Sequence, residues 1–180
     1  MPIPPLEEWV RQRAAHYDTA YVSSDPHFAH AHITLLGPFV HEGRLTAEVS
    51  DRVGAVLSRQ APFVVRLGEV GVFPDGTIYL SPEPAKSLCR LTDDLVEAFP
   101  GYPPYGGAYR VRPHLTLDRV GPRVDVESVR ASVSDLVPVN VEVGEASLSW
   151  YEQDACREIT RWALSGVAVP GRRRDRGDGQ

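Results

Sequence analysis

The chain has 180 residues and a formal net charge of -5 at pH 7, a size that predicts one domain, or two intimately packed lobes, around a buried apolar core. No apolar run reaches the length of a membrane span, and the first ten residues have neither the basic nor the apolar region of a secretion signal, so we expect a soluble cytoplasmic protein. The negative charge argues against a protein that coats nucleic acid, whereas a small nucleotide or an RNA end remains compatible as a substrate.

Hydrophobic periodicity and turn residues divide the chain into short helices and strands. In chain order we expect helix 5–17, strand 30–36, helix 45–57, strand 62–73, strand 77–81, helix 88–99, strand 112–117, helix 126–136, strand 138–150 and strand 157–165. Pro4 and Pro5 suit the start of the first helix, and Gly37 with Pro38 ends the first strand.

Two patterns occur twice in this order. His-x-Thr-Leu begins at His32 and again at His114, each time within a short apolar run. The segment that opens at Pro62 also resembles the one that opens at Pro138, with alternating valines and a Gly-Glu step in each. Together the two repeats indicate an internal duplication.

The duplication predicts the fold class and the domain organisation. Each half supplies a helix, a motif strand, a second helix and two further strands. We therefore expect an α+β fold that is bilobal and pseudo-two-fold, with two antiparallel-dominated sheets facing a central cleft and helices outside. Residues 1–168 form a single domain of two interleaved lobes in this interpretation, and the Gly-rich basic tail 169–180 is disordered.

Each motif carries an imidazole and a hydroxyl on the same face of its strand, because residues two apart point the same way. Histidine both takes and gives a proton near neutrality. One neutral imidazole can remove a proton from water while the other, protonated, gives a proton to a leaving oxygen. Thr34 and Thr116 can donate to the non-bridging oxygens of a phosphate. His32 and His114 are thus the expected catalytic pair for phosphodiester chemistry without a metal, although a single His-x-Thr in a strand is usually only a half-exposed surface pair.

With HITL and HLTL in these contexts, the chain resembles the two-histidine (2H) phosphoesterases, in particular the bacterial proteins named 2'-5' RNA ligases or RNA 2',3'-cyclic phosphodiesterases. The segments VGVFPDGTIYLSPEP and YPPYGGAYRVRPHLTL strengthen the resemblance, which covers residues 5–165 in pattern. It implies a bilobal fold with both motifs lining the cleft, His32 and His114 as the acid and base, Thr34 and Thr116 as phosphate ligands, and a 2'-phosphomonoester as the product. Members of the family commonly begin with a strand; here the C-terminal strand could fill that place.

Two arginines near the second motif are further candidates for phosphate binding. Arg119 lies five residues after His114, where cyclic phosphodiesterases of this family often carry a phosphate-contacting arginine, but it could equally cap the end of the strand. Arg112 falls on the same strand face as His114, so it is a second candidate.

Aromatic residues beside the motifs could stack on a base. Tyr105 and Tyr109 lie in the Gly/Pro-rich loop before the second motif, and Phe39 follows the first. All three could instead close a hydrophobic corner of the fold.

Metal and disulfide chemistry have little support. HFAHAH places His30 and His32 two residues apart, but it lacks the defined spacing of a third ligand, so no metal and no cofactor are expected. His30 is placed at the cleft edge, with His27 and His41 on solvated loops. Cys89 and Cys156 lie far apart outside any CxxC pattern and are predicted to be reduced.

The sequence supports two functions. The first is a metal-independent enzyme that opens 2',3'-cyclic phosphates of RNA ends or small nucleotides, with possible reversal to ligation. The second is a binding module that grips a nucleotide or RNA end in the same cleft without turnover. The oligomeric state is not readable from the sequence.

Overall fold

The computed structural model describes residues 1–17, 19–107 and 111–167. Its helices are α1 (Glu7–Tyr17), α2 (Ala47–Leu57), α3 (Lys86–Ala98) and α4 (Val126–Val133). Its strands are β1 (Phe63–Val72), β2 (Thr77–Glu83), β3 (Leu115–Arg119), β4 (Val139–Val143), β5 (Glu145–Trp150) and β6 (Arg157–Ala163). Short 3-10 turns occupy Pro4–Leu6, Thr19–Tyr21, Glu42–Arg44 and Pro104–Gly107.

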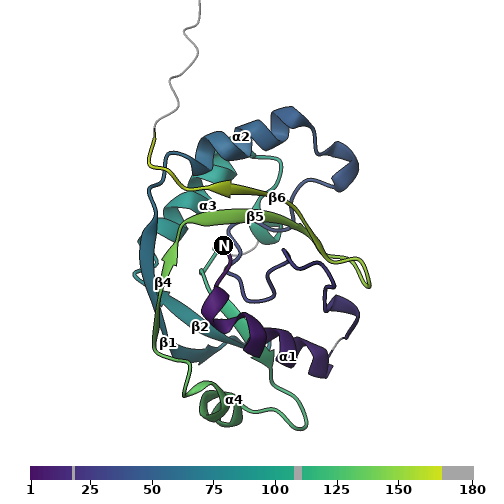
Figure 1. Cartoon of the computed structure of the whole chain (residues 1–180), viewed down its shortest axis with the longest axis vertical. Coiled ribbons are helices and arrows are strands. Elements are labelled where there is room, and N and C mark those ends of the chain that lie inside the picture. Colours follow the sequence, from purple (N-terminus) through teal and green to yellow (C-terminus); the bar gives the residue numbers. More distant parts are fainter. Residues whose placement is uncertain (18, 108–110, 168–180) are drawn as a thin grey trace, which may run out of the picture.

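Two antiparallel sheets confirm the expected α+β fold class. One has the strand order β3-β2-β1-β4, and the other pairs β5 with β6. Figure 1 shows α2 and α3 at one end of the molecule and α4 at the other. Helix α2 packs against α3 and β6, α1 against β3, and α4 against β1. Gly54 allows the close approach of α2 to β6, because a Cβ atom there would lie 2.9 Å from the Trp162 ring.

The pairing of β1 with β4 carries the pseudo-two-fold relation between the halves. The register pairs Phe63 with Val143, Val65 with Val141, and Leu67 with Val139. When the repeated segments are aligned at Pro62 and Pro138, Val65 is equivalent to Val141. The central pair therefore joins equivalent residues, and each flanking pair joins the start of one segment to the end of the other. A two-fold axis relating the repeats therefore passes near this central pair.

The segment 138–150 was expected as one strand, and the structure corrects this. It divides at Gly144 into β4, which pairs with β1, and β5, which pairs with β6. In Figure 1 the two follow one another along a single curved path from the lower sheet to the upper one. The break occurs where the chain passes from one sheet to the other.

The first motif also differs from the expectation, because HITL is extended but belongs to none of the strands β1–β6. Its ladder consists of two isolated antiparallel bridges, Pro2 with His32 and Ile33 with Leu115. The backbone N–H of Ile3 donates to Ala31 (2.8 Å), and that of Ile33 donates to Met1 (2.9 Å). Residues 1–3, rather than the C-terminal strand, thus lie beside the first motif.

One contiguous set of buried side chains supports both motifs. Ile33 and Leu115 are fully buried at their bridge, and Leu80 and Leu67 on β2 and β1 are equally inaccessible. Burying such side chains stabilises the fold by roughly 1.5–3 kcal/mol each. Since the apolar residues of both motifs belong to this core, their polar neighbours have fixed positions above it.

Candidate active site

The two motifs lie side by side. In an antiparallel pair, the residues that flank a paired couple oppose each other. The bridge between Ile33 and Leu115 therefore places His32 opposite Thr116, and Thr34 opposite His114. Because Ile33 and Leu115 point into the core, these four polar side chains occupy the other face. Both threonines are exposed and both histidines are half-buried, so the arrangement forms an accessible group of two imidazoles and two hydroxyls.

The two imidazoles are oriented in the same way. The Nδ1 atom of His114 lies 2.7 Å from the carbonyl oxygen of Arg112, and that of His32 lies 2.9 Å from the carbonyl oxygen of His30. A carbonyl only accepts, so Nδ1 carries the hydrogen in both rings. The Nε2 atoms are then the proton acceptors of the neutral rings. Each motif uses the backbone two residues earlier to set this tautomer.

Aromatic side chains contact each histidine. Near His114, Phe73 makes an edge contact with centroids 4.9 Å apart, and Tyr79 lies 5.7 Å away. Gly71 makes room for the Tyr79 ring, because a Cβ there would lie 2.6 Å from it. Near His32, the Tyr151 hydroxyl lies 3.2 Å from Nε2. Phe73 follows β1 and Tyr151 follows β5, so each histidine meets an aromatic residue from the repeat to which it does not belong.

A carboxylate on α1 holds the backbone of the first motif. Glu7 Oε1 accepts from the backbone N–H of His30 (3.1 Å) and lies 2.6 Å from His30 Nδ1, while Oε2 accepts from the backbone N–H of Ala31 (2.8 Å). The Nε2 atom of His30 accepts from the backbone N–H of Ser23 (3.1 Å). Partial burial acts to raise the pKa of Glu7, but the hydrogen bonds from His30 and Ala31 outweigh it and lower that pKa.

Among the described residues, the hydrogen bonds that Glu7 accepts are not repeated at the second motif, because Pro113 precedes His114 and has no N–H to donate. The ring of proline restricts the backbone there instead. Since the His30 carbonyl orients His32, Glu7 is a positioning residue for His32 although it does not touch that ring.

Removing the Glu7 carboxylate should reduce turnover through misplacement of His32. We expect Glu7→Ala to lower kcat for the expected opening of a 2',3'-cyclic phosphate about 10-fold with little change in KM, and Glu7→Gln to lie between it and wild type. Glu8→Ala is the matched control, because Glu8 is exposed and bonds to Gln12 of its own helix. Steady-state kinetics of the folded variants decide the point, and a purely structural role predicts unchanged kcat per folded molecule.

Burial lowers the pKa of His32 to about 4, and the positive charge of the Met1 amino group adds to this effect. The amino group is itself buried, which lowers its pKa to about 5. It is therefore mostly uncharged at neutral pH, which leaves burial as the dominant cause. His32 is accordingly neutral at pH 7, with Nε2 as its proton-accepting nitrogen.

The shift of His32 predicts a loss of stability in acid. The unfolded chain takes up this proton near pH 6.5 and the folded chain near pH 4, so between these values the unfolded state binds more protons. The free energy of unfolding should fall on the order of 1–3 kcal/mol more for wild type than for His32→Gln between pH 6.5 and 4. Urea unfolding at a series of pH values measures the difference, and parallel curves would contradict it.

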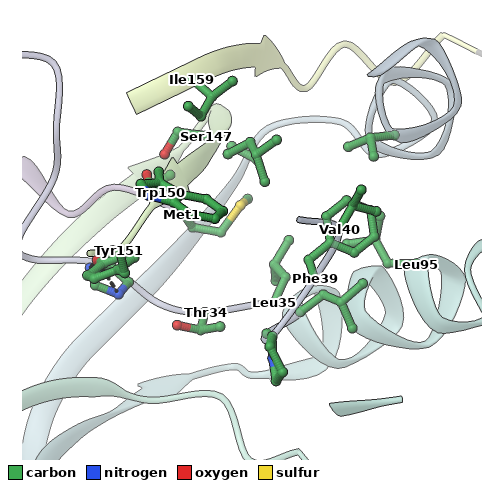
Figure 2. A pocket seen from close by; sticks show the side chains of 18 of the residues that line it. Met1, Thr34, Leu35, Phe39, Val40, Leu95, Ser147, Trp150, Tyr151 and Ile159 are labelled. Atoms are coloured by element: carbon green, nitrogen blue, oxygen red, sulfur yellow. Dashed lines mark hydrogen bonds between the residues drawn. The ribbon is translucent and has the colours of Figure 1, made fainter. Parts of the chain in front are cut away.

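A cavity of about 630 Å³ adjoins the first motif. His32 and Thr34 line it, together with the segment that follows to Glu42, the strand β5 and part of α2. Figure 2 shows Thr34, Leu35 and Phe39 on one side, facing Ser147, Trp150 and Ile159. No described residue of the second motif lines this cavity, so the site is asymmetric despite its paired motifs.

The two candidate arginines occupy different surroundings. Arg112 is exposed, with its guanidinium carbon 5.4 Å from the centroid of the Tyr79 ring, and Tyr79 in turn contacts His114. Arg119 is exposed and donates from Nη2 to the carbonyl of Asp75 in the β1–β2 turn (3.2 Å). Arg112 is thus linked to the second histidine through one ring, whereas Arg119 is held at the far end of β3.

The aromatic candidates also separate. Phe39 packs edge-on against Phe99 and Tyr102 with centroids 5.0 and 5.3 Å away, so it closes a hydrophobic corner while also lining the cavity. Tyr105 is 50% exposed with a φ of 51°. Tyr109 lies outside the described residues.

The other histidines and both cysteines lie outside the pair of catalytic candidates. His30, expected at the cleft edge, is buried behind the motif, with a side chain 6% exposed. His27 and His41 are exposed as expected. Within residues 1–17, 19–107 and 111–167, no group of three or more His, Cys, Asp or Glu side chains is placed to hold a metal ion. Cys89 and Cys156 form no disulfide. In the same residues, no helix combines the length and apolar character that a bilayer crossing needs.

Comparison with known families decides the relationship. A model of the 2'-5' RNA ligase superfamily matches residues 2–155. The chain belongs to this superfamily. This membership indicates a function of the phosphoesterase or ligase type. No curated protein sequence matches the chain.

Solved structures show that the fold is shared. Escherichia coli LigT complexed with 3'-AMP has a TM-score of 0.56 at 19% identity, covering 92% of this chain and 94% of LigT. The protein TT0787 of Thermus thermophilus has a TM-score of 0.56 at 21% identity, covering 91% of each chain. A protein described as a phosphoesterase has a TM-score of 0.52 at 19% identity, covering 92% of this chain and 95% of its own.

In this member of the 2'-5' RNA ligase superfamily, the sequence reasoning missed the residues that support the site. Glu7 follows two prolines at a helix start, where an acidic residue is common for reasons of the helix dipole alone. Phe73, Tyr79 and Tyr151 reach the histidines only through strand pairing. Phe73 and Tyr151 stand at the ends of predicted strands and Tyr79 lies inside the predicted strand 77–81, and their aromatic character is the signal that could have identified them.

Proposed function

We propose that the protein is a metal-independent phosphodiesterase that opens 2',3'-cyclic phosphates of RNA ends or small nucleotides to 2'-phosphates. The observation that carries the proposal is the cross-strand register, which sets His32 opposite Thr116 and Thr34 opposite His114. Membership of the 2'-5' RNA ligase superfamily supports this class of chemistry.

The reaction needs one neutral and one protonated imidazole. The neutral ring takes a proton from water through Nε2 as the water oxygen attacks phosphorus. The P–O3' bond breaks, and the protonated ring gives its proton to O3', which leaves a 2'-phosphate and a 3'-hydroxyl. Thr34 and Thr116 donate to the non-bridging oxygens and stabilise their developing charge. The direction in which the substrate lies determines which histidine is beside O3' and therefore serves as the acid. The bound phosphate anion raises the pKa of that imidazole and so favours its protonated form.

The arginines have supporting roles in this proposal. Arg112, which lies over Tyr79 beside His114, can meet the phosphate or the chain that continues from it. Arg119 would have to release the Asp75 carbonyl to do so. Tyr105, which is exposed, can stack on a neighbouring base in this proposal.

The known structures of LigT support small nucleotides as ligands, because LigT is complexed with 3'-AMP in one and with NADP+ in another. The superfamily name also suggests 2'-5' ligation. In the proposed mechanism ligation is the same displacement with a 5'-hydroxyl in the place of water: its oxygen attacks phosphorus, the P–O3' bond breaks, and a 2'-5' linkage forms beside a free 3'-hydroxyl.

Hydrolysis of a panel of 2',3'-cyclic nucleotides in EDTA tests the proposal, with 2'- and 3'-phosphate products resolved. Turnover to the 2'-phosphate in chelator is the expected result. Products with a 3'-phosphate, or turnover that requires an added metal, would contradict the mechanism. Saturable binding without product would instead indicate the nucleotide-binding module.

A further inference from the structure

We infer that the cavity beside the first motif is a pocket for a nucleobase of the substrate. This inference rests on the proposed function, because it assigns a place to the part of the substrate that the histidines and threonines do not hold. It concerns the cavity of about 630 Å³ described above, a volume within the range of small-molecule sites.

The location of the cavity makes the assignment specific. Two of the four polar motif residues, His32 and Thr34, belong to its wall. A phosphate held between the motifs is therefore in contact with the mouth of the cavity. Since the second motif lies outside it, a substrate has one direction in which a ring attached near the phosphate can be buried.

The charge of the lining excludes a second phosphate inside the cavity. No arginine or lysine is among the described lining residues. The carboxylate there, Glu42, is paired through both oxygens with Nη2 of Arg157 at 2.6 Å. The inner wall is apolar and buried, with Leu35, Val53, Leu57 and Ala146. The occupant is consequently an uncharged group.

Aromatic side chains on both sides favour a flat ring over an alkyl chain. Phe39 and His41 come from the segment after the first motif, and Trp150 and Tyr151 come from the end of β5. Stacking on such rings is the usual way in which proteins hold an unpaired base.

Trp150 is a fixed part of this wall. Its Nε1 donates to Glu152 (2.9 Å), the ring of His41 meets it edge-on at 5.2 Å, and the Arg157 guanidinium lies 5.9 Å from its centroid. Ser147 and Ser149 add hydroxyls to the lining, and these can bond to the nitrogen and oxygen atoms at the edge of a base. An alkyl group would leave them without such partners.

Filling the cavity tests the inference. Ser147→Phe occupies it, Trp150→Ala removes the wall, and Val64→Phe is the matched control because Val64 is 55% exposed on β1 and does not line it. The substrates are adenosine 2',3'-cyclic phosphate and the methyl and hexyl riboside 2',3'-cyclic phosphates, which lack the base. Circular dichroism verifies that each variant is folded.

The expected result is a wild-type preference of at least about 10-fold in kcat/KM for the adenosine compound over both ribosides. Ser147→Phe and Trp150→Ala should each reduce that preference about 10-fold, whereas Val64→Phe should alter neither the preference nor the turnover of the methyl riboside. An unchanged preference in both cavity variants would overturn the inference. A hexyl riboside as good as the adenosine compound would show an unspecific apolar pocket and would also overturn it.

Calorimetric titration with adenosine 3'-monophosphate separates this inference from the proposed function. Binding to wild type and to His114→Ala, with binding to Ser147→Phe weaker by about 10-fold or more, supports the pocket even where no cyclic phosphate is hydrolysed. Equal binding to wild type and Ser147→Phe contradicts the pocket even where hydrolysis proceeds.

Discussion

Alanine at His32 or at His114 should each lower kcat/KM for a 2',3'-cyclic nucleotide by about 10²–10⁴-fold, the usual range for removal of a general acid or base. The reason is that each imidazole handles a different proton in the same transition state. The double variant should lose little more than the worse single variant, since the two groups act as a unit. Steady-state hydrolysis of the folded variants gives these values.

His27→Ala is the control for this series. His27 is an exposed histidine a few residues before the first motif, and its backbone N–H donates to Asp25. Its removal should leave kcat/KM within about two-fold of wild type. Turnover near the wild-type rate in either single motif variant would exclude the paired acid–base mechanism.

Removal of Arg13 has the largest expected effect on stability. On α1, Arg13 donates from Nε to Oδ2 of Asp118 (2.7 Å), the residue that follows HLTL on β3 and is 3% exposed. The other Asp118 oxygen accepts from the backbone N–H of Arg119 (2.7 Å). Arg13→Ala leaves a buried carboxylate without its ion-pair partner, so we expect a loss of about 3 kcal/mol in the free energy of unfolding.

Urea unfolding measures this loss, and Arg11→Ala is the matched control on the same helix. Arg11 pairs at 4.0 Å with Glu8, and both side chains are largely exposed, so its removal should change stability by less than about 0.5 kcal/mol. Equal effects of the two substitutions would show that the pair between α1 and β3 does not stabilise the fold. Glu7 binds the backbone just before the first motif, and Arg13 binds the residue just after the second. Helix α1 therefore holds both motifs in place.

The sequence alone determined the fold class and the four central residues of the candidate site. Local signals sufficed because hydrophobic periodicity reports helices and strands directly, and because the duplication shows His32, Thr34, His114 and Thr116 as a repeated set. The repeated Gly-Glu step also marked Gly144, although its meaning as the passage between two sheets depended on which strands pair on either side.

Only the tertiary structure decided which residues surround the histidines. Glu7 reaches residues 30 and 31, and Tyr151 reaches His32 across 119 positions of the chain. Such contacts depend on strand register and helix packing, which no local pattern encodes. The same holds for the first motif, where residues 1–3 take the place expected for the C-terminal strand. The cavity beside His32 likewise arises from segments that are distant in sequence, because a pocket is the space that packing leaves between elements and not a property of any one of them.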